Sequence, residues 1–474
     1  MSKYLPTIGI EVHVELKTNT KIFSNSRNGY GSVVNSLTNV VDLGYPGTLP
    51  TLNEEVINLG IKAATVLNCK IRRQMHFDRK NYFYPDNPKN YQITQNDTPI
   101  GYDGYVEIND DGVMKKIYIE EMHIEEDTCK STHRKDNTYL DFNRAGVPLI
   151  EIVTKPCMTT PNEAKLYLEK LRELLFYTDV SDCKMEEGSM RADANISLRK
   201  KESDPFGTKV EIKNIGSISN VKLSLEKEIA RQEKMIDNNE PFKPQTRRFD
   251  SKLNDTVLMR VKETGNDYRY FPEPDIPFVI ITDEMIENVK KTIPMLPDER
   301  REKYIELGIS EINSNKLVQN RDLSDYMNNL LDEKIDFQTG ANLLLGDISA
   351  YLNKEEKTIE ETTLNIERFI DLVNNVSNKT ISSKNLKDIL ETIMTKEDSI
   401  EKIISSSDIK NITDENLLTE VVDKIIEANP ESVNDYKNGH DRAIKYLMGQ
   451  IMKETKGGAN PALVMSILKD KLDK

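Results

Sequence analysis

Three segments of the chain alternate between apolar and polar residues, which is the pattern of a β-strand with one buried face. Residues 8–16 read IGIEVHVEL, residues 192–198 read ADANISL and residues 209–213 read KVEIK. In the first segment Glu11 and His13 point to one side and the apolar residues to the other. We therefore predict strands, each with a polar face, at all three places.

Helical signals dominate elsewhere. Thr160 can cap a helix, Pro161 suits its first turn and Glu163 completes a capping box. Beyond the prolines at residues 293–297, apolar residues recur at helical spacing. These patterns predict an α+β chain with an α+β domain over residues 1–292, a helical domain over 293–404 and a small helical domain over 405–474.

Composition narrows the class of protein. The 474 residues are 30% charged and 37% hydrophobic, as is typical of a globular protein. We expect neither a transmembrane helix nor a signal peptide, because the sequence has no long apolar run and no basic N-terminus before an apolar stretch. The cysteines Cys69, Cys129, Cys157 and Cys183 are scattered. We therefore expect no cysteine zinc site and a reduced, cytoplasmic setting.

The net charge of −14 argues against a broad basic face for nucleic acid. The last 40 residues nevertheless hold eight basic and five acidic side chains. The basic ones are Lys437, Arg442, Lys445, Lys453, Lys456, Lys469, Lys471 and Lys474. A local nucleic-acid contact and a merely solvated helical surface both fit this pattern.

The polar faces of the strands suggest a cation site. If the strands share one sheet, that face would concentrate Glu11, His13, Glu126, Asp193 and Glu211, with residue 126 coming from a further extended segment. Carboxylates at that density repel one another unless a cation neutralises them. Mg²⁺ with ATP phosphates is the natural fit.

Three cations near these strands, Arg191, Lys209 and Lys213, could hold phosphate oxygens. The sequence contains no P-loop and no G-x-G-x-x-G turn, so any ATP site has another architecture. It also contains no local signature of a nucleophile for glutamine hydrolysis. The alternative is a sheet whose polar face is simply solvated, because the sequence does not establish that these strands adjoin.

Five longer motifs resemble the GatB family of tRNA-dependent amidotransferase subunits, and the likeness runs almost end to end. They are IGIEVHVEL at residues 8–16, FDRKNYFYPD at 77–86, DFNRAGVPLIEI at 141–152, KMEEGSMRADAN at 184–195 and DYRYFPEPD at 267–275. The region after residue 298 is too short for the inserted synthetase-like domain of an archaeal relative, which favours the bacterial type.

The resemblance implies a glutamine-synthetase-like cradle domain with a mainly antiparallel sheet, followed by a helical domain and a YqeY-like tail. It implies that ATP phosphorylates the side-chain carboxylate of Glu on tRNA(Gln), or of Asp on tRNA(Asn). Ammonia from a glutaminase A subunit then displaces phosphate, and a small C subunit completes a heterotrimer.

The resemblance also implies roles for particular residues. Metal and kinase positions fall on Glu11, His13, Glu126 and Glu211, with Glu125 and Asp193 close by. Lys80 and Lys89 are candidates for lining an ammonia route, although a surface or phosphate role suits them equally. The tail would bind the outer corner of the tRNA. This favours a nucleic-acid contact for the basic residues among the last 40. Relatives with paired CxxC motifs hold zinc, which we do not expect here.

Other hypotheses remain at this point. One is a free-standing ATP-dependent amide ligase acting on a small acid, which could use the same acidic face. Another is a tRNA-binding scaffold without catalytic activity. His123 could be a residue that orients a metal ligand or an ordinary structural histidine.

Overall fold

The computed structural model describes residues 3–261, 267–381, 383–407, 415–437, 440, 442–455, 459 and 461–473. The chain divides into two compact units, Met1–Leu296 and Pro297–Lys474. In the described residues the first unit mixes helices with strands and the second is helical. The predicted α+β class is therefore confirmed, whereas the three-domain division at residues 292 and 404 stays a prediction.

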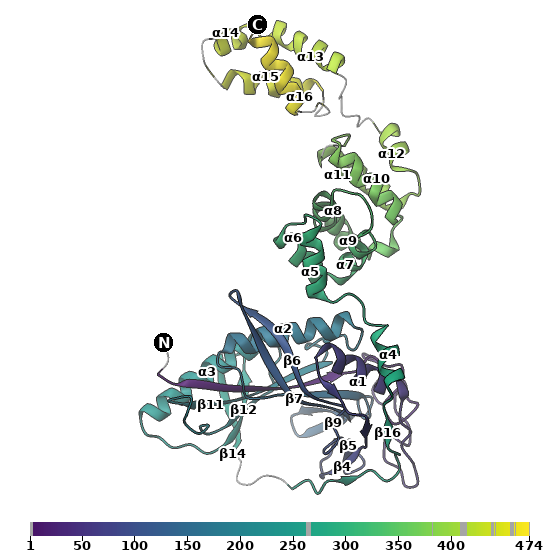
Figure 1. Ribbon diagram of the computed structural model, residues 1–474, viewed down its shortest axis with the longest axis vertical. Coiled ribbons are helices and arrows are strands. Elements are labelled where there is room, and N and C mark those ends of the chain that lie inside the picture. Colours follow the sequence, from purple (N-terminus) through teal and green to yellow (C-terminus); the bar gives the residue numbers. More distant parts are fainter. Residues whose placement is uncertain are drawn as a thin grey trace. The chain divides into compact units, whose positions relative to one another are not determined.

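A nine-stranded sheet organises the described part of the first unit (Figure 1). Its order is β14 (Asp255–Val261), β13 (Gln245–Asp250), β12 (Val210–Lys213), β11 (Met190–Arg199), β1 (Leu5–Glu15), β10 (Pro148–Thr154), β7 (Val113–Glu126), β6 (Gly101–Asp110) and β2 (Lys70–Ile71). Neighbours pair antiparallel, except that β12 and β13 run parallel. The expected mainly antiparallel sheet is thus confirmed.

The alternation in β1 gives the sheet its two faces. Ile8, Ile10, Val12 and Val14 are at most 1% exposed and belong to the main hydrophobic core. Helices α1 (Glu54–Val66), α2 (Pro161–Tyr177) and α3 (Ile218–Asp237) cover this apolar face (Figure 1). The predicted capping box of Thr160 is present at the start of α2. The polar side chains of β1 project from the opposite face of the sheet.

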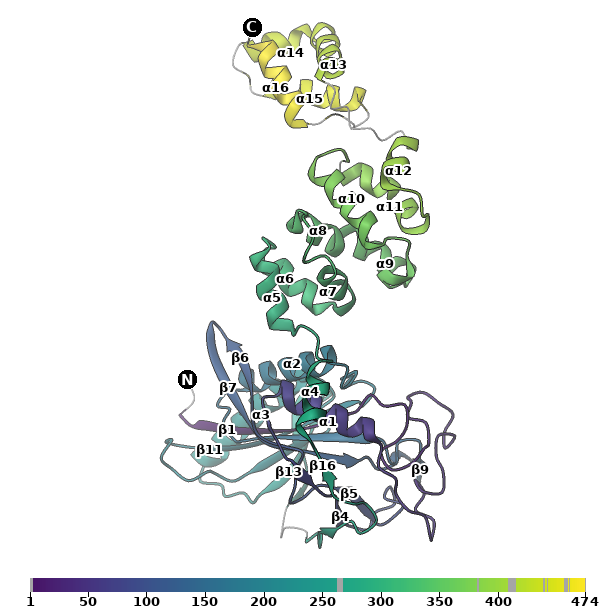
Figure 2. The ribbon, with the colours of Figure 1, turned by 45° about the vertical axis from the view of Figure 1, so that its right-hand side comes forward.

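Short strands occupy the side of the sheet away from α2, where both views show β4 and β5 (Figure 1 and Figure 2). There β15 (Phe271–Pro272), β4 (Asp78–Asn81) and β5 (Tyr91–Thr94) pair with one another, and β5 contacts β7. Two further antiparallel pairs are β3 (Gln74–Met75) with β16 (Val279–Ile280) and β8 (Lys130–Arg134) with β9 (Asn137–Asp141).

Helix α4 (Asp283–Lys290) belongs to the first unit, and the second unit contains only helical elements among its described residues. These are α5 (Pro297–Glu306), α6 (Glu311–Gln319), α7 (Arg321–Asn328), α8 (Phe337–Leu343), a π-helical turn (Leu344–Ile348), α9 (Ser349–Glu355), a 3-10 turn (Ile359–Glu361), α10 (Ile366–Ser377), α11 (Ser383–Thr395), α12 (Ile400–Ser406), α13 (Glu415–Ala428), α14 (Pro430–Lys437), α15 (Arg442–Glu454) and α16 (Pro461–Leu472). Buried residues of α13, α15 and α16 form a core cluster of their own. None of the described helices has the length and apolar character needed to span a membrane.

Candidate active site

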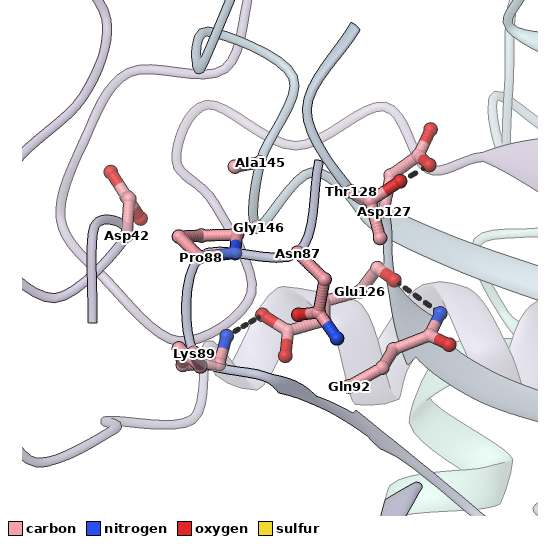
Figure 3. Close-up of a pocket in the computed structure, with 10 residues that line it drawn as sticks. All are labelled: Asp42, Asn87, Pro88, Lys89, Gln92, Glu126, Asp127, Thr128, Ala145 and Gly146. Carbon is pink, nitrogen blue, oxygen red and sulfur yellow. Dashed lines mark hydrogen bonds and ion pairs between the residues drawn. The ribbon is translucent and has the colours of Figure 1, made fainter. Parts of the chain in front are cut away.

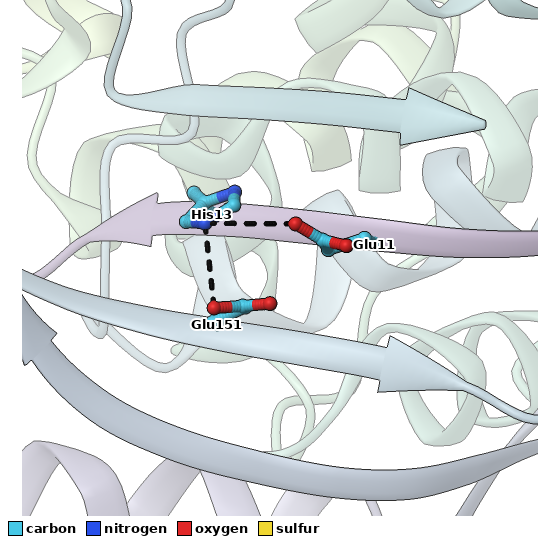
Figure 4. A group of neighbouring side chains, drawn as sticks. All are labelled: Glu11, His13 and Glu151. Carbon is cyan, nitrogen blue, oxygen red and sulfur yellow. Dashed lines mark ion pairs between the residues drawn. The ribbon is translucent and has the colours of Figure 1, made fainter. Parts of the chain in front are cut away.

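The polar face of the sheet brings two histidines and a glutamate into one row. His13 on β1 pairs in register with Glu151 on β10, and Glu151 pairs with His123 on β7. Residues paired in this way project from the same face of a sheet. Figure 4 shows Glu11, His13 and Glu151 converging from the two neighbouring strands.

Short contacts link these side chains. The Nε2 atom of His13 lies 3.5 Å from Glu151 Oε2 and 3.6 Å from Glu125 Oε1. Glu11 Oε1 lies 3.9 Å from the same nitrogen. On the far side of the row, His123 Nε2 lies 2.9 Å from Glu151 Oε2. We call Glu11, His13, His123, Glu125 and Glu151 the carboxylate–histidine cluster.

Burial and mutual repulsion disturb the ionisation of the cluster. Burial, followed by the charge of Glu151, raises the pKa of Glu11 to about 7, and the same two causes raise the pKa of Glu125. Burial lowers the pKa of His13, but hydrogen bonding and charge from Glu151 outweigh it and bring that pKa to about 9. Burial would raise the pKa of Glu151, yet its bonds to His123 and His13 hold it well below its ordinary value.

The donor set suits a hard divalent cation. In the described residues, ligand atoms of Glu11, His13 and Glu151 lie within 4.8 Å of one another, and so do those of His123, Glu125 and Glu151. Carboxylate oxygens favour Mg²⁺, Ca²⁺ or Mn²⁺, whereas imidazole favours ions of iron, nickel, copper and zinc. Burial and the charge of Glu151 disfavour the ionised forms of Glu11 and Glu125, and a bound cation would favour them.

A second polar group adjoins the cluster through β11. Asp193 pairs in register with Glu11, and Lys213 Nζ lies 2.5 Å from Asp193 and 3.0 Å from Glu211. Glu211 also accepts a hydrogen bond from Thr246 at 3.1 Å. The ammonium group of Lys213 therefore bridges two carboxylates beside the cluster.

The other two predicted phosphate ligands have different surroundings. Arg191 pairs in register with His13 and donates to Asp127 at 2.7 Å. Lys209 is exposed just before β12 begins. The positive side chains named from the sequence thus border the polar face on the side of β11 and β12.

Glu126 lies apart from the cluster although its neighbour Glu125 belongs to it. Successive strand residues project from opposite faces. Glu126 instead bonds Lys89 Nζ at 2.6 Å and accepts from the backbone N–H of Ile93 at 2.9 Å. Figure 3 shows the Lys89–Glu126 ion pair in a pocket. That pocket is lined by Asp42, Asn87, Pro88, Lys89, Gln92, Glu126, Asp127, Thr128, Ala145 and Gly146.

The charges of two cluster residues, Glu125 and Glu151, act on Lys80. Its Nζ atom sits 5.0 Å from the centre of the Tyr268 ring. Burial lowers the pKa of Lys80, but the charges of Glu125, Tyr270 and Glu151 outweigh it and raise that pKa above its ordinary value. The two lysines therefore interact with different carboxylates of β7, Lys80 with Glu125 through its charge and Lys89 with Glu126 in an ion pair.

In the tail, five of the basic residues named from the sequence are exposed, whereas Lys471 is half-buried and pairs with Asp423; the exposed ones are Lys437, Arg442, Lys445, Lys453 and Lys469. Lys437 ends α14, and Arg442, Lys445 and Lys453 lie on α15. Arg442 and Lys453 are eleven residues apart, about three turns, and so share one face of the helix. Lys456 falls outside the described residues.

Sequence reasoning did not name Glu151 as a site residue. Its signal was present, because it is the one charged residue in the apolar run LIEIV at residues 149–153. A charged side chain inside such a strand needs a partner, and here the partners are the two histidines. Asp127, the partner of Arg191, was not named as a site residue either, although it ends the acidic run EED at residues 125–127.

Comparisons with known proteins agree with this architecture. Residues 6–287 match the family model of the GatB/GatE catalytic domain, and residues 325–472 match that of the GatB domain. A Bacillus cereus protein described as the B subunit of an aspartyl/glutamyl-tRNA(Asn/Gln) amidotransferase is 49% identical over 468 residues, 98% of each chain. A Bacillus mycoides protein of the same description is 48% identical over the same share of both chains. The chain belongs to the GatB family.

Proposed function

We propose that this chain is the B subunit of an amidotransferase that converts Glu-tRNA(Gln) to Gln-tRNA(Gln), Asp-tRNA(Asn) to Asn-tRNA(Asn), or both. The observation that carries the proposal is 49% identity over 98% of a relative described by that activity. The carboxylate–histidine cluster on the sheet supports it, because phosphoryl transfer between two anions needs a cation-binding face. The reaction makes the chain part of a ligase that forms a carbon–nitrogen bond.

In the proposed reaction, a side-chain carboxylate oxygen of the aminoacyl group attacks the terminal phosphorus of ATP, and ADP leaves. The nitrogen of ammonia then attacks the carbonyl carbon of this acyl phosphate. Phosphate departs with the bonding electrons and the new amide releases a proton. Amide formation needs the prior phosphorylation, because oxide is a poor leaving group from an unactivated carboxylate.

Mg²⁺ would be held by Glu11, His13 and Glu151, whose ligand atoms lie within 4.8 Å of one another, with Glu125 next to them, 3.6 Å from His13 Nε2. Bound there, the ion would offset the charge brought together by the triphosphate and the substrate carboxylate. Lys213, together with Asp193 and Glu211, would orient phosphate oxygens next to it. Arg191 and Lys209 would contribute further positive charge on the same side.

Ammonia would come from a glutaminase A subunit, with a C subunit completing the heterotrimer. Lys80 and Lys89 are the proposed residues along its route, with Glu126 as the partner of Lys89. The tail would hold the tRNA through Lys437, Arg442, Lys445 and Lys453, and Tyr446, 50% exposed on the same helix as the last three, offers a ring for stacking. Because charged tRNA is used in the cytoplasm, we propose that compartment.

The test uses the assembled heterotrimer carrying Glu11→Gln or His13→Ala. Cleavage of ATP that depends on Glu-tRNA(Gln) should fall by about 100-fold or more, since a metal centre contributes several kcal/mol and about 1.4 kcal/mol is a factor of ten. Hydrolysis of glutamine by the A subunit should continue. Undiminished ATP cleavage would refute the assignment.

Glu107→Gln is the matched control, because Glu107 is a glutamate of the same sheet that is half exposed and paired only with Lys116 in the described contacts. It should leave ATP cleavage unchanged. Activity of the isolated chain on free glutamate or aspartate, equal to that on the tRNA esters, would instead support a free-standing ligase.

A further inference from the structure

A surface segment of the first unit, residues 267–275, runs beside β4, the strand that carries Lys80. We call this segment the strap. Its strand β15 pairs with β4 at only two positions, and Glu273 is the one buried residue of the strap. A two-residue pairing holds a segment weakly. Side chains must therefore supply most of the attachment of the strap to the body of the unit.

A buried ion pair anchors the C-terminal half of the strap. Arg79 of β4 binds both carboxylate oxygens of Glu273, through Nε at 2.5 Å and through Nη2 at 2.9 Å. The side chain of Glu273 is fully buried, and its backbone N–H donates to the carbonyl of Phe77 at 2.8 Å. The guanidinium of Arg79 also lies 3.2 Å from Asp275 and 4.2 Å from the centre of the Tyr91 ring. Such a planar two-point contact is specific to arginine, so it fixes the path of the strap.

Asn81, two residues further along β4, holds the N-terminal half of the strap. Its backbone N–H donates to the carbonyl of Tyr268 at 2.9 Å, and its side-chain amide donates to the carbonyl of Arg269 at 2.8 Å. Arg269 has a φ of +48°, a left-handed conformation that persists in a residue with a side chain only when its surroundings hold it. The strap is therefore fastened at both ends, by Arg79 and by Asn81.

Tyrosine rings of the strap lie beside Lys80 and so beside the carboxylate–histidine cluster. The Nζ atom of Lys80 lies 5.0 Å from the centre of the Tyr268 ring. That ring packs edge-to-face against Tyr82 at 6.2 Å and against Tyr270 at 6.1 Å. The charge of Glu151 in the cluster acts on both Lys80 and Tyr270. Rings packed in this way exclude water from the side of Lys80 that they cover.

We propose that Arg79 is a positioning residue: by holding the strap it keeps Tyr268 over Lys80 and shields the acyl phosphate from water. The inference rests on the proposed function. In an unshielded site, the oxygen of water attacks the carbonyl carbon of the acyl phosphate and phosphate leaves with the bonding electrons. The original carboxylate is restored and a proton is released, so ATP is consumed without formation of an amide. The strap thus sets the share of cleaved ATP that ends in product.

The test is Arg79→Gln in the assembled heterotrimer, with Glu-tRNA(Gln) as substrate and ammonium chloride as the nitrogen source, so that hydrolysis of glutamine plays no part. The ratio of ADP formed to Gln-tRNA(Gln) formed should rise about threefold or more, because an amide side chain cannot reproduce the two-point contact with Glu273 and the strap opens. The excess ADP should shrink as the ammonium concentration rises, since ammonia and water compete for the same acyl phosphate.

Tyr268→Ser is a second variant, which leaves the ion pair of the strap intact and removes the ring that faces Lys80. It should raise the ratio in the same direction, and it decides the matter if circular dichroism shows that Arg79→Gln is unfolded. Arg73→Gln is the matched control, because Arg73 also pairs with a distant carboxylate, that of Asp283, but its side chain is 54% exposed. The control should leave the ratio unchanged.

Several results would overturn the proposal. One is an unchanged ratio of ADP to amide in the folded variants. Others are equal losses of ATP cleavage and amidation, which indicate a merely structural role, and a raised ratio that does not respond to ammonium. Failure of the proposed function is distinguishable, because the unsubstituted heterotrimer would then neither cleave ATP in response to Glu-tRNA(Gln) nor amidate it.

Discussion

The Nε2 atom of His123 lies 2.9 Å from Glu151 Oε2, the same oxygen that His13 approaches from the next strand at 3.5 Å. Two imidazoles thus share one carboxylate oxygen in the interior of the sheet. His123 is 13% exposed in its side chain and holds Glu151 from one side. We propose that His123 acts on the cation through this carboxylate.

Replacing His123 should therefore change the requirement for metal. We expect His123→Leu to raise the Mg²⁺ concentration for half-maximal tRNA amidation by about 10- to 100-fold, as is typical when a group that orients a ligand is removed. His123→Asn should restore part of the affinity, because its amide can still donate to Glu151. A control at His133, which is exposed on β8, should leave the Mg²⁺ titration unchanged. An unaltered titration in His123→Leu would contradict the positioning role.

The pH dependence of stability should report the raised pKa values of Glu11 and His13. Glu11 has a pKa of about 7 in the folded protein instead of 4.5. Between these pH values the folded protein holds a proton that the unfolded chain releases, which stabilises the fold. This stabilisation is lost as the pH rises through the higher value. His13, with a pKa of about 9 instead of 6.5, stabilises the fold fully below the lower value and loses this contribution as pH rises through the higher one. Both groups act in the same direction.

Without divalent cation, the free energy of unfolding of the full chain should therefore be lower at pH about 8.5 than at pH about 5.5. Urea denaturation in a chelating buffer measures it. Glu11→Gln should flatten the decline, and added Mg²⁺ should raise stability mainly at the higher pH. A profile that rises with pH in the chelating buffer would contradict these ionisations.

A buried charge holds β13 and β14 against α3. Glu228 is 0% exposed and binds Arg231 through both carboxylate oxygens at 2.7 and 2.9 Å. It also accepts from Thr256 at 3.1 Å and lies 3.5 Å from Arg247. Glu228→Ala should lower the free energy of unfolding by about 3–5 kcal/mol, because it leaves cations without their partner.

Glu226→Ala, two residues away on the exposed side of α3, provides the comparison and should change stability by less than about 0.5 kcal/mol. Thermal or denaturant unfolding of both variants gives the difference. If the two variants were equally stable, the Glu228 network would contribute nothing to the fold.

The basic residues of the tail lead to a separate prediction about tRNA affinity. Substituting Arg442, Lys445 and Lys453 with Ala should weaken tRNA binding at low salt and reduce the slope of affinity against salt by about one for each phosphate that is no longer neutralised. Glutamine hydrolysis should be unaffected. Lys402→Ala is the control, because Lys402 of α12 pairs with Asp398. Unchanged affinity in the triple variant would exclude this face of α15 as the tRNA-binding surface.

Alternation in the sequence predicted the faces of β1, β11 and β12 because a strand has a fixed period of two residues. It could not predict that β10 lies between β1 and β7, since pairing joins segments far apart in the chain. Glu151 stood out as a charge in an apolar run, but without this strand order its partners could not be predicted. The same alternation separates Glu125, which joins His13, from Glu126, which joins Lys89. Residues far apart in sequence, such as Asp127 and Arg191, meet only through the register of the sheet.

The position of β10 between β1 and β7 has a consequence for biosynthesis. The N-terminal strand leaves the ribosome first, but Glu11 and His13 find Glu151 only after the whole of β10 has emerged and paired with β1. A pairing slip of one residue would turn Glu151 to the apolar face. Nascent chains that end before β10, and chains paired out of register, therefore lack the proposed cation site, so metal binding would report on the correct pairing of β1 with β10.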